Sequence, residues 1–551
     1  MRQALGIVRR LRWPALAAVV AGAAIAVAGC GSGSSATGSS AGRPAEFVPA
    51  GSPAYLEVSA DMNSAQWRQV RALGSTFPGW DELTGEITKG LKDKGIDYRT
   101  DIAPYVGQRA AVAVTRAPGL DAQAAGGVLK GDAASAQGAA RAAARDTGVV
   151  AVVDLAEGKD QAVQNELAKA ANGMPGTHGG VSVYALDKDA FAAVDDGAAV
   201  VGSTRADLFA ALDAHAAGGD KTLAGTDRFA NALGQLPQDV FAQGYLDLGA
   251  LTRSLQSASS GLGNLPNGAK ALQDAAVAVS LTAESDGVRL KGVVTGAEDL
   301  TGQATEFTPT LTKQVPGDAI AYAGFDNLAG TIGNVIEQVG ESSPDLQKQI
   351  EALTGQIEPM LGVSVDDLSA LASGEQALVV TKGAPVPTVA LVSQVPDGAR
   401  AKQTLDTLRQ RVPALVKQMS PDTKIPAWNQ VGLANGVTGW QLPLSPKAGV
   451  VYGVDGNLAI VGTLPDGVRQ IQQPLSPLSQ DPDFVAATRG MPDQVTGVLW
   501  VNVEEAVNLA DAAGAFKGQP KVLANLRPLK NIVAWSTGGS TPTFEAFATI
   551  E

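Results

Sequence analysis

Residues 276–294 read AVAVSLTAESDGVRLKGVV, and this stretch decides the fold class. Two mostly apolar segments, Ala276–Thr282 and Val288–Val294, flank the turn sequence Ser285-Asp286-Gly287. A short turn containing glycine between two such segments is typical of a β-hairpin. We therefore predict antiparallel strand pairing at this point in the chain.

A second hairpin ends the chain, where Ile532–Ser536 and Phe544–Ile550 flank Gly538-Gly539. Its position reflects an internal repeat, because five segments of the first half recur in order in the second half, at offsets of 267, 267, 239, 260 and 255 residues. The segments begin at Val48, Gly107, Val150, Val200 and Phe229 and recur at Val315, Gly374, Val389, Ile460 and Phe484. The repeat predicts two homologous halves, residues 46–300 and 310–551, with an insertion at Leu120–Thr147.

Amphipathic helices are expected between the strands of each half. After a strand at Ala54–Val58, Ser64 or Asn63 is positioned to cap a helix, and a second apolar stripe begins at Trp80. The second half has corresponding stripes within residues 328–339 and 346–357. We predict an α+β fold of two tandem homologous halves, each a mainly antiparallel β-sheet with amphipathic helices packed on one face.

The N-terminus has the layout of a bacterial lipoprotein signal. Four arginines precede an apolar run from Pro14 to Ala28, which ends in the lipobox sequence Val27-Ala28-Gly29-Cys30. We predict a signal peptide at residues 1–29, lipidation of Cys30, and a Ser/Gly-rich tether at residues 30–45. An uncleaved anchor is disfavoured because the apolar run is shorter than the roughly twenty residues that span a bilayer. Cleavage at Ala26-Val27-Ala28 without lipidation is the other alternative.

This signal predicts a protein anchored by lipid to the outer, extracytoplasmic face of the cell membrane. Loss of residues 1–29 would remove four arginines and no acid, which changes the formal net charge from −13 to −17. A body this acidic repels nucleic acid and anionic lipid headgroups beyond about one Debye length, which disfavours both as partners.

Several segments of the first half resemble a family of actinobacterial cell-envelope lipoproteins, the domain-of-unknown-function 3352 family. The resemblance is carried by Phe47–Ala50, Ala54–Val58, Gln66-Trp67, Phe77–Gly79 and Asp101–Gly107. The family's usual block is Asp-x-x-Pro-Trp-Leu-Gly, and here Tyr105 and Val106 replace the Trp and Leu. The resemblance implies an envelope location and a non-catalytic role, and it supplies no site residues.

The sequence contains no catalytic motif, and we predict neither a cofactor nor a metal site. His178 is expected in a turn, and His215 at the end of a helix, where it complements the helix dipole. The acidic pair Asp195-Asp196 is interpreted as a turn between strands. Asp367, in the pair Asp366-Asp367, is interpreted as a helix N-cap.

Aromatic residues are the remaining candidates for contact with a ligand or partner. Tyr245 and Trp500 occupy matching positions of the repeat, and Trp428 and Trp440 lie in or beside an insertion of the second half. Burial in the core is the alternative for all four. We expect a non-catalytic binding or interaction module of the envelope, whose partner is an envelope protein, a cell-wall component or a lipid. The alternative function is a carrier of an apolar or lipid ligand in a cavity or cleft between the halves.

Overall fold

The computed structural model describes residues 42–93, 95, 97–116, 147–187, 190–258, 272–297, 305–331, 333, 352, 355, 358–383, 386–420, 422, 424–445 and 448–551. Cys30, the predicted signal peptide and nearly all of the predicted insertion lie outside these residues. The chain divides into two compact units: residues 1–300 with 540–545 and 550–551, and residues 301–539 with 546–549.

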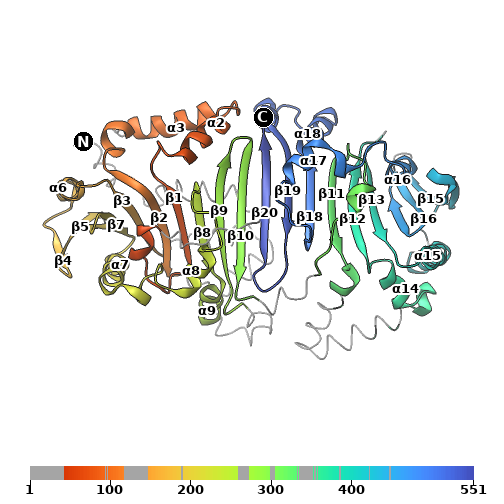
Figure 1. The fold of residues 1–551 in the computed structure, drawn as a ribbon, viewed down its shortest axis with the longest axis horizontal. Helices are drawn as coiled ribbons and strands as arrows, with labels where there is room; N and C mark the ends of the chain where they lie inside the picture. Colours follow the sequence, from red (N-terminus) through yellow and green to blue (C-terminus); the bar gives the residue numbers. More distant parts are fainter. Residues whose placement is uncertain are drawn as a thin grey trace. The chain divides into compact units, whose positions relative to one another are not determined.

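The first unit is built on an antiparallel sheet (Figure 1). Its strands pair in the order β10-β9-β8-β1-β2-β3-β7-β6-β5-β4. Their bounds are β1 Ala54–Ser59, β2 Val106–Arg116, β3 Gly148–Leu155, β4 Gly176–His178, β5 Val181–Asp187, β6 Ala190–Asp195, β7 Ala198–Gly202, β8 Ala242–Asp247, β9 Ala276–Glu284 and β10 Gly287–Thr295. Strands β9 and β10 form the predicted hairpin, with Gly287 opposite Glu284.

The second unit is also built on an antiparallel sheet. Its strands pair in the order β19-β18-β11-β12-β13-β17-β16-β15-β14, and β20 pairs with β19 as predicted. Their bounds are β11 Ala321–Asp326, β12 Glu375–Thr381, β13 Thr388–Gln394, β14 Asn429–Gly432, β15 Thr438–Ser445, β16 Ala448–Asp455, β17 Leu458–Gly462, β18 Gly497–Asn502, β19 Leu529–Ser536 and β20 Thr543–Ile550.

Helices connect many of these strands. In the first unit they are α2 Ala65–Gly74, α3 Trp80–Lys92, α6 Asp160–Ala170, α7 Arg205–Ala217, α8 Asp227–Leu233 and α9 Leu248–Ala258. In the second they are α14 Val365–Ala370, α15 Gly398–Met419, α16 Pro465–Gln472, α17 Pro482–Ala487, α18 Val503–Ala512 and α19 Pro520–Leu526. Ser64 caps α2 as predicted, and its side chain accepts a hydrogen bond from the Trp67 amide at 3.2 Å. Helix α9 was not predicted, although Leu248 and Leu251 stand at helical spacing.

One face of each sheet forms a core, on which α8 packs in the first unit and α17 in the second. In the first unit, Phe229 of α8 makes edge-to-face contacts with Tyr55 and Tyr245, at centroid distances of 5.4 and 5.0 Å. In the second unit, Phe484 of α17 meets Trp500 in the same manner at 5.5 Å. We call this face of each sheet the core face.

The prediction that helices pack on one face of the sheet is wrong. Along β6, Ala193 belongs to a cluster that contains Leu208 of α7, whereas Ala192 on the opposite face packs in a cluster with Leu167 of α6. In the second unit, α16 and α15 both contact β16 and β17. The physical reason is that these strands carry apolar side chains on both faces, so that each face needs a cover.

Candidate functional site

Two of the predicted contact residues are core residues. Tyr245 is 4% exposed and Trp500 is 1% exposed, and both lie on the core face. Tyr245 stands opposite Tyr55 of β1, and Trp500 stands opposite Tyr322 of β11. In this structure neither side chain reaches a surface from which it could contact a ligand.

The other two, Trp428 and Trp440, lie together and are partly exposed. Trp440 on β15 is directly opposite Tyr452 on β16, and Trp428 makes an edge-to-face contact with Tyr452 at 5.7 Å. The Arg409 guanidinium of α15 lies 3.9 Å from the centroid of the Trp440 ring. Both tryptophans therefore belong to the corner where α15 meets the sheet.

Polar contacts hold this corner in place. Arg409 Nε donates to the Tyr452 hydroxyl at 3.0 Å, and this hydroxyl donates to Asp406 Oδ1 at 2.6 Å. Lys402 Nζ donates to the other oxygen of Asp406 at 2.6 Å. Although burial acts to raise the pKa of Asp406, the hydrogen bonds from Lys402 and Tyr452 lower it. The acid is therefore ionised at neutral pH and fixes α15 against β16.

The largest unexplained feature is the second face of each sheet, away from the core face. In the second unit one row across the strands contains Ala534, Leu499, Ala323, Leu378, Leu391 and Val461, each directly opposite the next. The adjacent row contains Ile532, Val501, Ala321, Val380 and Val389. We call these eleven residues the open face. It carries no charged side chain and no hydrogen-bonding side chain.

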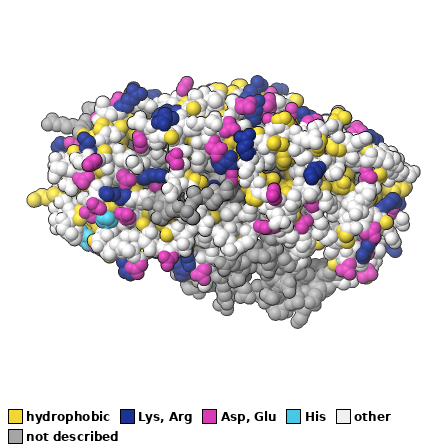
Figure 2. Space-filling model, viewed as in Figure 1, with side chains coloured by type: hydrophobic (Ala, Val, Ile, Leu, Met, Phe, Trp, Pro, Cys, Tyr) yellow, Lys and Arg dark blue, Asp and Glu magenta, His cyan; other side chains and the backbone are white. Residues whose placement is uncertain are grey.

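The open face is accessible as well as apolar. Leu378 is 45% exposed, Val389 is 41% exposed and Leu391 is 37% exposed, and all of its other members except Ala534 are partly exposed. Figure 2 shows hydrophobic side chains gathered in the region of strands β18, β11 and β12. An antiparallel sheet with one core face usually presents a polar face to water, so an apolar second face indicates a contact surface.

The corresponding face of the first unit has the same character but is less exposed. One row contains Val279, Gly244, Leu56, Val112, Ala151 and Val201. Among these, Ala151 is only 7% exposed, and the row continues to Ala192 beneath α6. The second unit therefore offers the more accessible surface.

Buried carboxyl groups were a feature that sequence reasoning missed. Glu57 is fully buried, and it accepts hydrogen bonds from the Tyr55 hydroxyl and from Gln243 Nε2, the latter at 3.0 Å. Glu375 accepts from the amides of Thr310 and Leu311 at 2.9 and 2.8 Å. Burial raises the pKa of both carboxyl groups. Because both are inaccessible to substrate, we assign them a structural role.

Both histidines stack on phenylalanine and face an acid. His178, predicted in a turn, is instead the last residue of β4; it stacks on Phe209 and lies 2.7 Å from Asp213. His215, in the last turn of α7 as predicted, stacks on Phe47. Among the described residues, no three His, Cys, Asp or Glu side chains are grouped so that they could hold a metal ion.

A family model described as "Protein of unknown function (DUF3352)" matches residues 14–533. The chain belongs to this family. The resemblance to this family noted in the sequence is therefore confirmed. The family's description names no activity, so the function has to be argued from the site. No curated protein matches the chain significantly. Within the described residues, no helix is long and apolar enough to cross a membrane.

Solved structures of TP0453 cover part of this DUF3352 protein. Crystal form IV is 12% identical and covers 46% of this chain and 81% of that chain, with a TM-score of 0.24. Crystal form III has the same identity and TM-score and is covered to 80%. At this TM-score the likeness carries no argument.

Proposed function

We propose that this protein is a non-catalytic binding module of the cell envelope, held at the outer face of the membrane by a lipid on Cys30. The observation that carries the binding role is the open face. Its eleven residues offer apolar contact and no group that could act as an acid, base or nucleophile. An exposed aliphatic surface of this kind is stabilised when an apolar partner covers it.

The same observation favours the second candidate, a carrier of an apolar or lipid ligand. A site without donors or acceptors recognises its ligand by apolar area alone, as a carrier of hydrocarbon chains would. In either case the ligand is bound through Leu378 and Leu391, which are the most exposed leucines of the open face.

We further propose that the two units are copies of one fold. The pairing order supports this, because the strands of the first unit, β9-β8-β1-β2-β3-β7-β6-β5-β4, correspond one by one to β19-β18-β11-β12-β13-β17-β16-β15-β14. Within this order Tyr55 lies between Ala113 and Tyr245, and Tyr322 lies between Val379 and Trp500.

The experiment that tests the binding role is a double substitution on the open face. We expect Leu378→Gln with Leu391→Gln to weaken binding of a hydrophobic dye such as anilinonaphthalene sulfonate at least tenfold, because each buried leucine contributes about 2 kcal/mol. Native mass spectrometry of the protein purified from its host should show loss of any co-purifying molecule in parallel.

A matched control replaces apolar residues that are exposed elsewhere. Leu475 is fully exposed and Val485 is 52% exposed, so Leu475→Gln with Val485→Gln removes similar apolar area outside the open face. Equal loss of dye binding in both double variants would refute the assignment. Thermal unfolding should be nearly unchanged in both, because the replaced side chains are accessible to solvent.

A further inference from the structure

Helix α15 differs in charge from the rest of this acidic chain. Its 22 residues contain five basic side chains and one acid, Asp406, whereas the whole chain has a net charge of −13. The basic residues are Arg400, Lys402, Arg409, Arg411 and Lys417. Repulsion by the distant acidic residues is screened beyond roughly 8 Å at physiological salt, so the local charge of α15 decides what can approach it.

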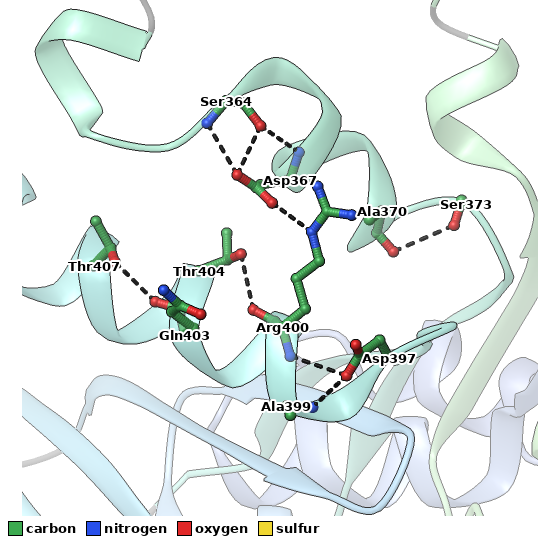
Figure 3. A network of polar contacts seen from close by, with 10 residues as sticks. All are labelled: Ser364, Asp367, Ala370, Ser373, Asp397, Ala399, Arg400, Gln403, Thr404 and Thr407. Carbon is green, nitrogen blue, oxygen red and sulfur yellow. Dashed lines mark hydrogen bonds and ion pairs between the residues drawn. The ribbon is translucent and has the colours of Figure 1, made fainter.

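The two halves of this helix use their basic residues differently. In the first half, Arg400 Nε is paired with Asp367 of α14 at 2.6 Å, next to the Asp397 cap (Figure 3), and Lys402 is paired with Asp406. In the second half, no ion pair within the described part of the chain involves Arg411 or Lys417. Arg409 is paired with Asp406 at 3.6 Å, so the charges of the second half that are available to a partner are those of Arg411 and Lys417.

The apolar stripe of α15 also continues past the region that the sheet covers. Ala401 and Thr404 are buried, Leu408 is partly exposed, and Val412, which continues the stripe at helical spacing, is 39% exposed. Leu415 and Val416 follow one turn later and are partly exposed. Arg409 flanks the stripe on one side and Arg411 flanks it on the other, by the geometry of a helix, whereas Lys417 lies near the opposite side.

The corner beside this helix supplies the aromatic residues typical of a membrane interface. Trp440 and Trp428 are partly exposed, although Nε1 of Trp428 is buried, and Leu444, further along β15, is 60% exposed. Tryptophan is enriched at the level of lipid headgroups, where its ring is apolar and its N–H is wet. A basic amphipathic helix with tryptophan beside it is typical of segments that lie in the plane of an anionic membrane surface.

We propose that the second half of α15, residues 409–419, docks with the Trp428–Trp440 corner onto an anionic lipid bilayer. Arg411 faces the headgroups, and Val412 with Leu444 enters the boundary of the acyl region. This contact lies beyond the open face on the same side of the sheet, because Val461 is directly opposite Tyr452 and Tyr452 is directly opposite Trp440. It would orient the second unit on the membrane to which the lipid anchor is proposed to hold the chain.

The test uses the predicted mature chain without its cysteine, residues 31–551, so that neither an acyl chain nor the basic, apolar segment of residues 1–29 contributes. Co-sedimentation is measured with vesicles of phosphatidylglycerol and phosphatidylcholine in equal parts and with vesicles of phosphatidylcholine alone. We expect binding to the mixed vesicles only, weakened by high salt. Arg411→Gln should weaken it about fivefold, because a basic residue near an anionic surface contributes about that factor. Lys417→Gln should weaken it less, because Lys417 lies on the opposite side of the helix.

Lys517→Gln is the matched control for Arg411→Gln, since Lys517 is exposed and the change in net charge is the same. Equal weakening in this control, or equal binding to both kinds of vesicle, would overturn the proposal. Retention of an acidic polymer such as polyglutamate in preference to the mixed vesicles would also overturn it. Val412→Ser keeps the charges and should still weaken vesicle binding. Loss of vesicle binding in Leu378→Gln with Leu391→Gln would overturn the proposal, because it would place the contact on the open face.

Discussion

Individual carboxyl groups are buried, wholly or in part, within the sheets, where apolar side chains are the usual occupants. Asp154 on β3 has one oxygen, Oδ1, that is buried without a hydrogen-bond partner. Burial, reinforced by the nearby charge of Glu57, raises the pKa of Asp154 to about 6. Nothing in the sequence around residue 154 indicates this, because the acids involved come from different strands.

The raised pKa makes a prediction about pH. An acid whose pKa is higher in the folded chain than in the unfolded chain, where it is about 3.9, stabilises the fold below pH 4 and loses that contribution as the pH rises to 6. We therefore expect Asp154→Asn to stabilise the protein by roughly 1–2 kcal/mol at pH 7.5 and by little at pH 4. Urea unfolding at both pH values measures this, and Asp220→Asn, at an exposed position, should show no such difference. A variant that is less stable at pH 7.5 would contradict the prediction.

At the scale of elements, helix boundaries show which sequence signals were misread. Asp367 was predicted to be an N-cap, but Ser364 caps α14 and Asp367 is the third residue of the helix. The two residues form a capping box, in which each side chain accepts a hydrogen bond from the backbone amide of the other (Figure 3). Both Ser364 and Asp367 are good caps by residue type. The structure decides between them because Asp367 also binds Arg400 of α15.

Loss of the capping hydroxyl tests this assignment. Ser364→Ala should cost about 1 kcal/mol of helix stability, because the Asp367 amide loses its acceptor. Hydrogen exchange at the amides of residues 366–369 should accelerate accordingly. Asp366→Ala, one residue before Asp367, is the control, and an equal acceleration in that variant would show that Ser364 has no special role.

Strand register is the second point at this scale. Matching sequence segments paired Gly107–Thr115 with Gly374–Lys382 at 267 residues, and Val150 with Val389 at 239. Under the proposed equivalence of the two units, the strand registers place Ala113 where Val379 stands and Val150 where Ala390 stands, offsets of 266 and 240. A slip of one residue exchanges the two faces of a strand. Sequence matching missed it because both faces of these strands are apolar, so the pattern does not fix the register.

For the whole molecule, the most important prediction concerns the lipid anchor on Cys30. We expect Cys30→Ala to abolish incorporation of a fatty-acid label and to release the protein from the membrane fraction or leave it as an uncleaved precursor, because Cys30 is the only thiol in the chain. Cell fractionation with a clickable fatty acid measures both effects, with a high-salt wash that screens the proposed contact of α15 with anionic lipid. Ser32→Ala, two residues away, should change neither, and a Cys30→Ala variant that still takes up label would disprove the lipobox.

By itself, the sequence determined the mixed α+β class, the two hairpins and the membership of the family, because periodicity, turn residues and local motifs are read along the chain. Only the tertiary structure decided which apolar side chains are covered. Tyr245 and Trp500 are aromatic like Trp428 and Trp440, yet the first two are buried beneath α8 and α17 and the others are not. Leu378 and Val379 are neighbours on β12, but Leu378 lies on the open face and Val379 lies on the core face. The two faces differ only in what packs on them. Burial depends on contacts between residues distant in the chain, and a local pattern does not contain them.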